Sequence, residues 1–406
     1  MTRRTLITGM GVIAPSGTGT DGFWRSALEG RGALGRLSRY PAGDYPLTVA
    51  GEVRDHDPAH AIDPRITVQT DRFTQFALAA ADLALADARL DPATLPPYSF
   101  GAVTASAAGG VEFGQREIER LWSKGPAQVG PYQSIAWFYA ASTGQLSIRH
   151  GLKGPCGVLV ADESGGLDAI AHAARDIRYG TSAMLVGGAE APFAPFSMAC
   201  QYGHGLLSDA TDPDRAYLPF SPRARGFVPA EGGAVLVVEE EGLRGAGPRP
   251  PVRVAGHGTT HTGALNHEQS AEGLAKAITA ALDEAECPPG DIGVVYADGL
   301  AVPEADQAEA DALRAVFGPA LRTLPVTVPK AGYGRAYAGA AALDVVLATL
   351  TLRHGLIPPT PYADGTDLGI DLVTGAPRPT GTRAALVLAR GLAGGNSALV
   401  LRTDGS

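Results

Sequence analysis

Short apolar segments of strand type alternate with alanine-rich helical segments along nearly the whole chain, and this alternation limits the possible folds most strongly. It predicts an α/β protein whose sheets are covered by helices. The expected strands are Thr5–Val12, Ser99–Ser106, Ala183–Ala189, Ala234–Glu239, Val252–Gly256, Ile292–Ala297, Pro325–Val328, Arg383–Ala389 and Ser397–Arg402. The expected helices are Gln75–Asp87, Val111–Lys124, Glu272–Glu284, Ala305–Val316 and Ala338–Leu352.

A basic, Gly/Pro-rich segment without periodicity, Gly242–Arg253, is the best candidate for a linker. We therefore expect an N-terminal half of residues 1–245 and a C-terminal half of residues 246–406. Each half contains a strand, a glycine-rich turn and an alanine-rich helix with Leu-Asp near its start. The two segments are ADESGGLDAI from Ala161 and AGYGRAYAGAAALDVV from Ala331. One such match is weak evidence for duplication, because the Ala/Gly bias of the chain produces similar matches by accident.

The segment VLVADESGGLDAIAHAARDIRYG, which begins at Val158, runs from a strand through small residues into a helix. This geometry places the side chain of Glu163 at a helix N-terminus, where backbone N–H groups and the helix dipole stabilise an anion. A thiolate at this position would be reactive. A carboxylate is a poor acyl acceptor, so the sequence indicates a scaffold for covalent chemistry that lacks its nucleophile.

Composition excludes several classes of function. A net charge of −9 argues against nucleic acid and against an anionic membrane surface. No apolar run reaches membrane-spanning length, and the basic MTRR start is too short for a signal peptide. The cysteines Cys156, Cys200 and Cys287 are odd in number and scattered, so they indicate neither zinc nor a disulfide framework. We expect a cytoplasmic protein.

A dinucleotide site and a metal site are also weakly supported. The glycines Gly9–Gly11 follow a strand, but a third glycine is missing and Pro15 follows, which suits a turn better than a phosphate cradle. The carboxylates Asp298, Glu304 and Asp306 have no histidine at ligand spacing, and a solvated helix start explains them better than a metal. We expect surface positions, on a loop-like Thr/Gly-rich stretch, for His257, His261 and His267.

Six segments, in order, resemble the β-ketoacyl synthases of thiolase fold. They are ITGMGVIAPSG from Ile7, the turn around Glu163, YLPFSPRARGFVPAEGGAVLVVE from Tyr217, YADGLAVPEAD from Tyr296, PKAGYGRAYAGAAALD from Pro329 and GLAGGNSALV from Gly391. The resemblance covers essentially the whole chain. It implies a duplicated thiolase-like α/β fold with stacked αβαβα layers.

The departures from that family concern its catalytic residues. By resemblance, the nucleophilic cysteine falls at Glu163 and the two histidines fall at Asp298 and Arg335, whereas a family lysine is kept as Lys330. Histidine N–H groups would stabilise the enolate oxygen that develops during decarboxylation. An ionised aspartate cannot donate in this way, and arginine is a fixed cation that cannot shuttle protons. We therefore expect no catalytic residue and a non-condensing relative.

This pattern resembles the chain-length factor, the second subunit of the type II polyketide ketosynthase heterodimer. The segments WFYAASTGQLSIRHGLKGP from Trp137 and ADGLAVPEAD from Ala297 are similar to that subfamily. The resemblance implies that a catalytic ketosynthase subunit supplies the Cys-His-His set and the docking surface for acyl carrier protein. It also implies that Gly157–Ala161 pairs across the dyad, that the growing polyketide chain lies in an interface tunnel, and that no cofactor is needed.

Two interpretations of Glu163 remain open, because the subfamily commonly has Gln at this position. One is an auxiliary role in decarboxylation of the malonyl extender. The other, which we favour, is a buried anion neutralised by Arg335 and the helix N-terminus, since buried charges are normally paired. Asp298 is a second possible partner of Arg335.

The helix Val111–Lys124 is the expected determinant of specificity. Its residues Val111, Gly114 and Ile118 share one face, which Leu121 and Trp122 extend. A buried helix face would explain the apolar residues but not Gly114, because glycine inside a helix costs about 1 kcal/mol relative to alanine. The resemblance implies a tunnel gate here, and its modest side chains predict a relatively long product. Weaker candidates for the tunnel lining are Phe113, Phe196 and Leu392.

Two alternative functions stay open. The first is an active condensing enzyme or acyltransferase with another nucleophile, for which Ser164 lies beside the expected position. No histidine stands at the matching positions to activate it. The second is a structural homodimer without a tunnel.

Overall fold

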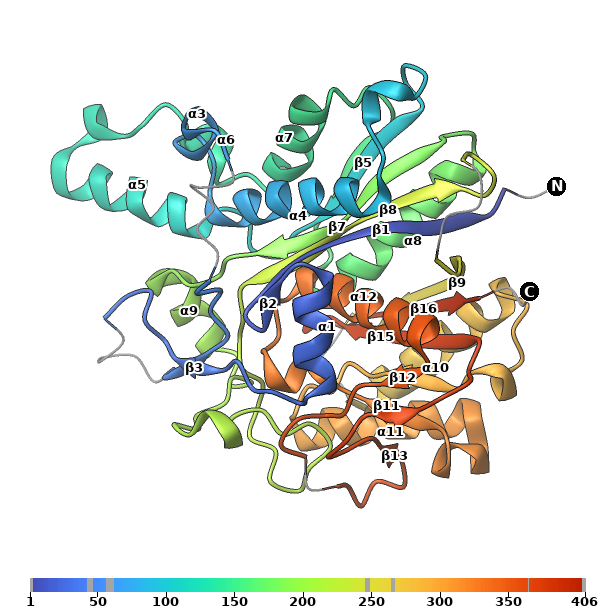
Figure 1. Cartoon of the computed structure of the whole chain (residues 1–406). Coiled ribbons are helices and arrows are strands. Elements are labelled where there is room, and N and C mark those ends of the chain that lie inside the picture. Colours follow the sequence, from blue (N-terminus) through green and yellow to red (C-terminus); the bar gives the residue numbers. More distant parts are fainter. Residues whose placement is uncertain are drawn as a thin grey trace.

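The computed structural model describes residues 3–41, 47–55, 62–244, 249–263, 267–363 and 365–403, with the side chains of 267–269 left aside (Figure 1). The main strands of the N-terminal half are β1 (Thr5–Ala14), β5 (Phe100–Ala105), β6 (Cys156–Leu159), β7 (Ala183–Glu190) and β8 (Gly232–Glu240). Its helices are α1 (Thr20–Leu28), α3 (Pro64–Thr67), α4 (Arg72–Ala88), α5 (Val111–Lys124), α6 (Gln133–Ala136), α7 (Ala141–His150), α8 (Gly165–Arg178) and α9 (Pro195–Tyr202).

The C-terminal half has an equivalent set. Its main strands are β9 (Val252–His261), β10 (Val294–Tyr296), β11 (Pro325–Thr327), β15 (Ala384–Arg390) and β16 (Gly395–Arg402), and its helices are α10 (His267–Glu284), α11 (Pro303–Phe317) and α12 (Ala338–His354). The short strands are β2 (Gly17–Thr18), β3 (Gly35–Arg36), β4 (Val49–Ala50), β12 (Leu356–Ile357), β13 (Asp371–Leu372) and β14 (Arg378–Pro379).

The two halves have one topology. The N-terminal strands follow the order β1-β8-β7-β5-β6, and the C-terminal strands follow β9-β16-β15-β10-β11. In each half the first three strands are antiparallel neighbours and the last three are parallel. The halves meet where Thr5–Ile7 of β1 pairs with Val252–Val254 of β9. This correspondence confirms the duplication expected from the sequence.

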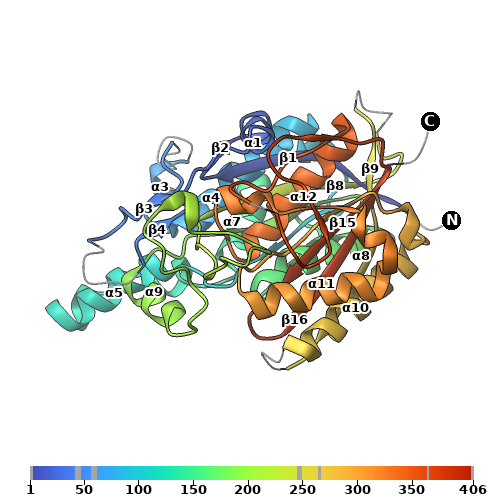
Figure 2. The same cartoon turned by 90° about the horizontal axis from the view of Figure 1, so that it is seen from below.

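Helices α8 and α12 form the central layer. Helix α8 contacts β5 and β7 on one side and β9 and β16 on the other, and α12 contacts β7, β8 and β15. The outer layers are α4 over β1, β8 and β7, and α10 over β9 and β16 (Figures 1 and 2). Almost every residue of α12 is buried, as expected for a helix that is apolar all round. The expected αβαβα layering is confirmed.

Small residues allow the two central helices to touch. A Cβ atom on Gly166 of α8 would lie 2.4 Å from the carbonyl oxygen of Ala338 in α12. A Cβ atom on Gly339 would lie 2.6 Å from the carbonyl oxygen of Gly232 in β8. The Ala/Gly bias of the chain therefore has a packing role, because bulkier residues would push the layers apart.

The Thr/Gly-rich stretch that we expected to be a loop is mostly strand. β9 continues to His261, because its residues from His257 to His261 pair with β16 from Leu399 back to Gly395. The expectation of a surface loop was therefore wrong for His257, whose side chain is buried. His261 is exposed, as expected. His267 begins α10, but its side chain lies outside the described part of the chain.

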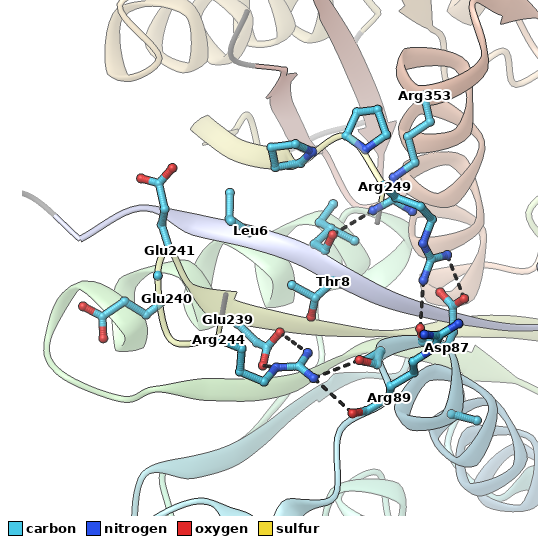
Figure 3. A pocket seen from close by; sticks show the side chains of 16 residues that line it. Leu6, Thr8, Asp87, Arg89, Glu239, Glu240, Glu241, Arg244, Arg249 and Arg353 are labelled. Atoms are coloured by element: carbon cyan, nitrogen blue, oxygen red, sulfur yellow. Dashed lines mark hydrogen bonds and ion pairs between the residues drawn. The ribbon is translucent and has the colours of Figure 1, made fainter. Parts of the chain in front are cut away.

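The described ends of the linker are fixed to the C-terminal end of α4, beside a cavity of about 830 Å³ (Figure 3). Arg244 donates to the carbonyl of Ala88 at 2.9 Å and pairs with Glu239 at 2.6 Å. Arg249 pairs with the carboxylate of Asp87 at 2.8 Å. Arginines at a helix C-terminus satisfy its last carbonyls, which accounts for the basic character of this linker. The boundary that we placed between residues 245 and 246 lies outside the described residues and stays a prediction.

In the described part of the chain, no helix has the length and apolar character that crossing a membrane requires.

The contact between the central helices can be tested with two adjacent glycines. We expect Gly166→Ala to lower the free energy of unfolding by about 1–3 kcal/mol, the usual cost of overpacking. Gly165→Ala is the control, because its Cβ atom would meet Ala105 at an ordinary 3.4 Å. Urea unfolding followed by circular dichroism measures both. Equal stability of the two variants would contradict the close approach of α8 and α12.

Candidate functional site

A tight turn carries Glu163 between β6 and α8. The residues Asp162–Ser164 form a 3-10 turn, η3, in which Asp162 adopts φ 55°, a conformation that non-glycine residues rarely adopt. One carboxylate oxygen of Asp162 accepts the N–H of Ala393 at 3.2 Å, which ties η3 to the loop after β15. The Glu163 side chain is only 2% exposed. The turn therefore directs it into the protein.

The three positions expected to be degenerate come together inside the molecule. Arg335 Nη1 lies 3.0 Å from Asp298 Oδ1, and Arg335 Nε lies 3.5 Å from Glu163 Oε1. A third guanidinium nitrogen donates to the carbonyl of Arg390 at 2.7 Å. All three side chains are buried. Both partners that the sequence suggested for Arg335 are thus present, and Asp298 is the closer one.

Backbone contacts hold Arg335 in place. The 3-10 turn η7 (Pro329–Gly332) leads into Gly334, whose φ of 93° is a conformation that favours glycine. The N–H of Arg335 then donates to Val228 at 2.8 Å. The guanidinium carbon lies 5.6 Å from the ring centroid of Phe227, within range of a cation–π contact.

The retained Lys330 serves the same region. Its ammonium nitrogen lies 2.5 Å from Asp344 Oδ2 and donates to the Ala297 carbonyl at 3.2 Å. It therefore helps to position the segment that carries Asp298.

Asp298 is held as an anion. Burial disfavours its charged form, but the nearby cations Arg335, Lys330 and Arg390 outweigh burial, so the pKa of Asp298 lies below its usual value. In turn, Asp298 and Glu163 raise the pKa of Arg335 against the effect of burial. The Asp298–Arg335 contact is therefore a true ion pair.

Glu163 has a different electrostatic environment. Burial raises the pKa of its carboxyl well above the usual value, and the cation of Arg335 only partly opposes this. The second carboxyl oxygen accepts the N–H of Leu392 at 3.4 Å. The expected anion neutralised by Arg335 is therefore an incomplete description, because Arg335 is engaged more closely by Asp298.

The expected solvated helix start is wrong for Asp298 and Asp306, which are buried, although Glu304 is exposed. Asp306 is 1% exposed, and its two oxygens accept the N–H groups of Phe220 at 2.6 Å and Ala301 at 3.0 Å. Burial raises its pKa to about 8. Its role is structural: it fixes the loop between β10 and α11.

A hydrogen-bonded group at the other end of η3 was missed by the sequence analysis. His257 Nε2 lies 3.0 Å from Asp168 Oδ1 and 2.9 Å from Ser397 Oγ. The Ser164 hydroxyl donates to the Ala161 carbonyl at 2.8 Å and lies 3.4 Å from Asp168 Oδ2. The only sequence signal was a histidine between two glycines in a β-prone stretch. This group joins α8 to the C-terminal sheet.

The proposed gate residues on α5 do not form a buried helix face of this chain. Phe113 and Gly114 are buried, but Ile118 is 49% and Trp122 83% exposed. A Cβ atom on Gly114 would meet Trp137 at an ordinary 3.7 Å, so neighbours within the chain do not require glycine. Val111 and Leu392 are half-buried, and Phe196 of α9 is exposed. The candidate gate and tunnel residues therefore lie in different places: Leu392 lies beside Glu163, and the others lie on α5 and α9.

The N-terminal sheet has an open edge at β6. β6 pairs with β5 and ends the strand order of the described sheet. Within the described chain no further strand pairs with the outer edge of β6, and an open strand edge readily pairs with another strand. Exposed apolar side chains on segments near it in the sequence are Ile135, Trp137, Phe138, Ile148 and Val160.

Comparison with known proteins assigns the chain to a family. The model "Beta-ketoacyl synthase, N-terminal domain" matches residues 2–242, and "Beta-ketoacyl synthase, C-terminal domain" matches residues 252–364. A putative polyketide beta-ketoacyl synthase 2 of Streptomyces halstedii is 57% identical over 98% of this chain and 97% of its own length. The tetracenomycin polyketide synthase ketoacyl synthase beta subunit of Streptomyces glaucescens is 49% identical over 98% of both chains.

A solved structure described as the ishigamide ketosynthase/chain length factor has a TM-score of 0.92 to this chain, at 25% identity and with complete coverage of both. These matches confirm the thiolase-like fold and the family that the sequence motifs indicated. The chain belongs to the β-ketoacyl synthase family and, within it, to the ketosynthase β subunits of type II polyketide synthases, the chain-length factors.

Proposed function

We propose that this chain is the non-condensing partner of a catalytic ketosynthase, and that it shapes the tunnel at their interface and limits the length of the polyketide. One observation carries the proposal. The positions of a condensing site converge here, but they hold the buried acid–arginine cluster of Glu163, Arg335 and Asp298. The arrangement of a condensing site is therefore present, but the residues that perform condensation are not.

The cluster of Glu163, Arg335 and Asp298 contains neither a thiol nor an imidazole group. The N–H of Leu392, which could stabilise a developing oxyanion, already donates to Glu163. Arg335 is ion-paired with Asp298 and donates to the Arg390 carbonyl, although its Nη1 makes no hydrogen bond within the described chain. Asp298 is an anion and cannot donate an N–H bond. A substrate carbonyl would have to break these contacts to enter.

Neither catalytic alternative gains support from the geometry. Ser164 donates its proton to a backbone carbonyl, and its nearest base in the described contacts is Asp168 at 3.4 Å rather than a histidine. Auxiliary decarboxylation by Glu163 would require the carboxyl to face a substrate. The carboxyl instead contacts Arg335 and the N–H of Leu392, so we regard Glu163 as structural.

The open edge of β6 and the exposed apolar side chains of α5, α6 and α9 support assembly. On this proposal the strand around Gly157–Ala161 pairs with its counterpart in the ketosynthase, and the exposed side chains of α5, α6 and α9 are covered. The partner would supply the Cys-His-His set and bind acyl carrier protein, so that this chain meets the carrier only indirectly. We place this assembly in the cytoplasm, in keeping with three free cysteines.

Acylation distinguishes this proposal from an active enzyme. Incubated alone with malonyl- or acyl-carrier protein, the chain should show no mass increase in intact-mass spectrometry. With a catalytic ketosynthase it should co-elute as a heterodimer, and the acyl group should appear on the ketosynthase. A stable adduct on the chain alone would favour an active acyltransferase, and recovery only as a self-associated dimer would favour a structural homodimer.

The gate is tested by filling the space at Gly114. We expect the heterodimer with Gly114→Phe to make mainly products that are shorter by one or more malonyl-derived units, because an aromatic ring would block the channel. Arg116→Phe is the matched control, since Arg116 is exposed and lies on the opposite side of α5. Liquid chromatography with mass spectrometry measures the masses of the products. An unchanged length distribution for Gly114→Phe would place the gate elsewhere.

The state of Glu163 has a measurable consequence for stability. Because burial raises the pKa of Glu163 above the usual 4.5, the folded protein keeps a proton on this carboxyl at pH values where the unfolded chain has already lost it. Stability is therefore lost progressively as the pH rises from 4.5 toward the raised pKa, by about 1.4 kcal/mol in total for each unit by which the pKa is raised. Glu163→Gln should therefore gain stability over the native protein as pH rises from 5 to 8.

Thermal unfolding across this pH range provides the measurement. Glu304→Gln, at the exposed start of α11, controls for the loss of one negative charge. Parallel pH profiles of the native protein and Glu163→Gln would mean that the carboxyl is a fully compensated anion.

A further inference from the structure

One buried carboxylate accepts hydrogen bonds from the first turns of two helices. Asp71 is 1% exposed and precedes α4 directly. Its Oδ1 accepts the N–H of Phe73 in α4 at 3.1 Å, which is an ordinary helix cap. Its Oδ2 accepts the N–H of Phe113 in α5 at 2.7 Å, across 42 positions of sequence.

Helix α5 has no cap of its own. The residue before it is Gly110, which has no side chain to accept a hydrogen bond from the first turn. The first N–H groups of a helix need partners from outside the helix, and its positive dipole end favours an anion. Asp71 supplies both to α5.

The anchor is rigid, whereas α5 extends from the body. Arg72, next to Asp71, is fixed by Glu231 at 2.9 Å and by the carbonyl of Val53 at 2.9 Å. Helix α4 packs on β1, β7 and β8 in the core. By contrast, the far end of α5 projects away from the sheets in both views (Figures 1 and 2). The start of α5 is therefore where its direction is set.

The other contacts of this first turn are weaker anchors. Glu112 pairs with Arg39 at 2.7 Å, but both side chains are more than a quarter exposed. Gln115 accepts the N–H of Phe196 at 2.9 Å in an exposed contact with α9. Surface contacts of this kind contribute little, because water competes for both partners.

An uncharged cap would serve α4 equally well. Burial raises the pKa of Asp71 to about 7, so the charge is costly at neutral pH. Asparagine caps helices as well as aspartate does, but it has one oxygen and its NH₂ group cannot accept. A carboxylate can offer a separate oxygen to each helix, as Asp71 does here.

We propose that Asp71 is the positioning residue of the gate helix: by holding the N–H of Phe113, it fixes where Phe113 and Gly114 stand in the channel and so narrows the distribution of product lengths. This inference rests on the proposed function of α5. It adds to the determinants of length a residue that acts through the backbone of Phe113.

The test compares Asp71→Asn with Asp306→Asn in the heterodimer. Asp306 is a matched control, since it is equally buried and also accepts two backbone N–H groups, but it lies away from α5. We expect Asp71→Asn to broaden or shift the product lengths, with about tenfold faster hydrogen exchange in the first turn of α5. Asp306→Asn should lower stability without changing either property.

A second variant keeps the inference testable if Asp71→Asn fails to assemble. Asp71→Ser preserves the cap of α4 but has one short acceptor, and exchange at α5 can be followed in the full chain without its partner. If the variants of Asp71 leave both the hydrogen exchange of α5 and the product lengths unchanged, the positioning role is overturned. If Gly114→Phe alters length while the Asp71 variants do not, only this inference fails. If none of them alters length, the proposed function fails as well.

Discussion

The structure depends on the close approach of α8 and α12, in which Gly166 lies against the backbone of Ala338. Each of these helices is preceded by a tight turn, η3 or η7, in the corresponding place of its half. Packing the helices together therefore brings the two turns, and with them Glu163 and Arg335, to one location. The convergence of residues 172 positions apart is a consequence of the duplicated topology and not of any local sequence signal.

The residues at that location determine which hydrogen bonds and charges it offers. A site with a nucleophile and two N–H donors would leave hydrogen-bonding groups unpaired, and a substrate could then pair with them. Here an arginine, two acids and the N–H of Leu392 contact one another in a buried cluster, although Arg335 Nη1 and Asp298 Oδ2 make no hydrogen bond within the described chain. Such clusters contribute little net stability, because desolvation offsets the attraction between the charges. Removing Arg335 or Asp298 would be costly, because the other charge would be left buried and unpaired, so the pair has a structural role without a catalytic one.

Much of this was predictable from the sequence. The expected α5 matches the observed helix at both ends, because Gly110 and Gly125 flank it. The pairing of Arg335 with both acids also followed from the motifs. That Arg335 lies closer to Asp298 than to Glu163 did not follow from the motifs. The two distances differ by half an ångström, and such a difference depends on the packing of distant segments. The extension of β9 was missed because its Thr/Gly-rich residues become a strand only through pairing with β16.

Three residues of α5 depart from the pattern of an ordinary surface helix. Glu117 is buried and accepts the N–H of Gly130 at 2.5 Å, whereas Ile118 and Trp122 face outward. A monomer gains nothing by exposing these side chains, because each could be buried at a gain of about 1.5–3 kcal/mol. The inner site is thus closed by its own ion pairs while the outer apolar surface lacks a cover within the described chain. On our proposal the chain contributes through that surface, as a wall positioned by Asp71, and its former catalytic centre only maintains the frame.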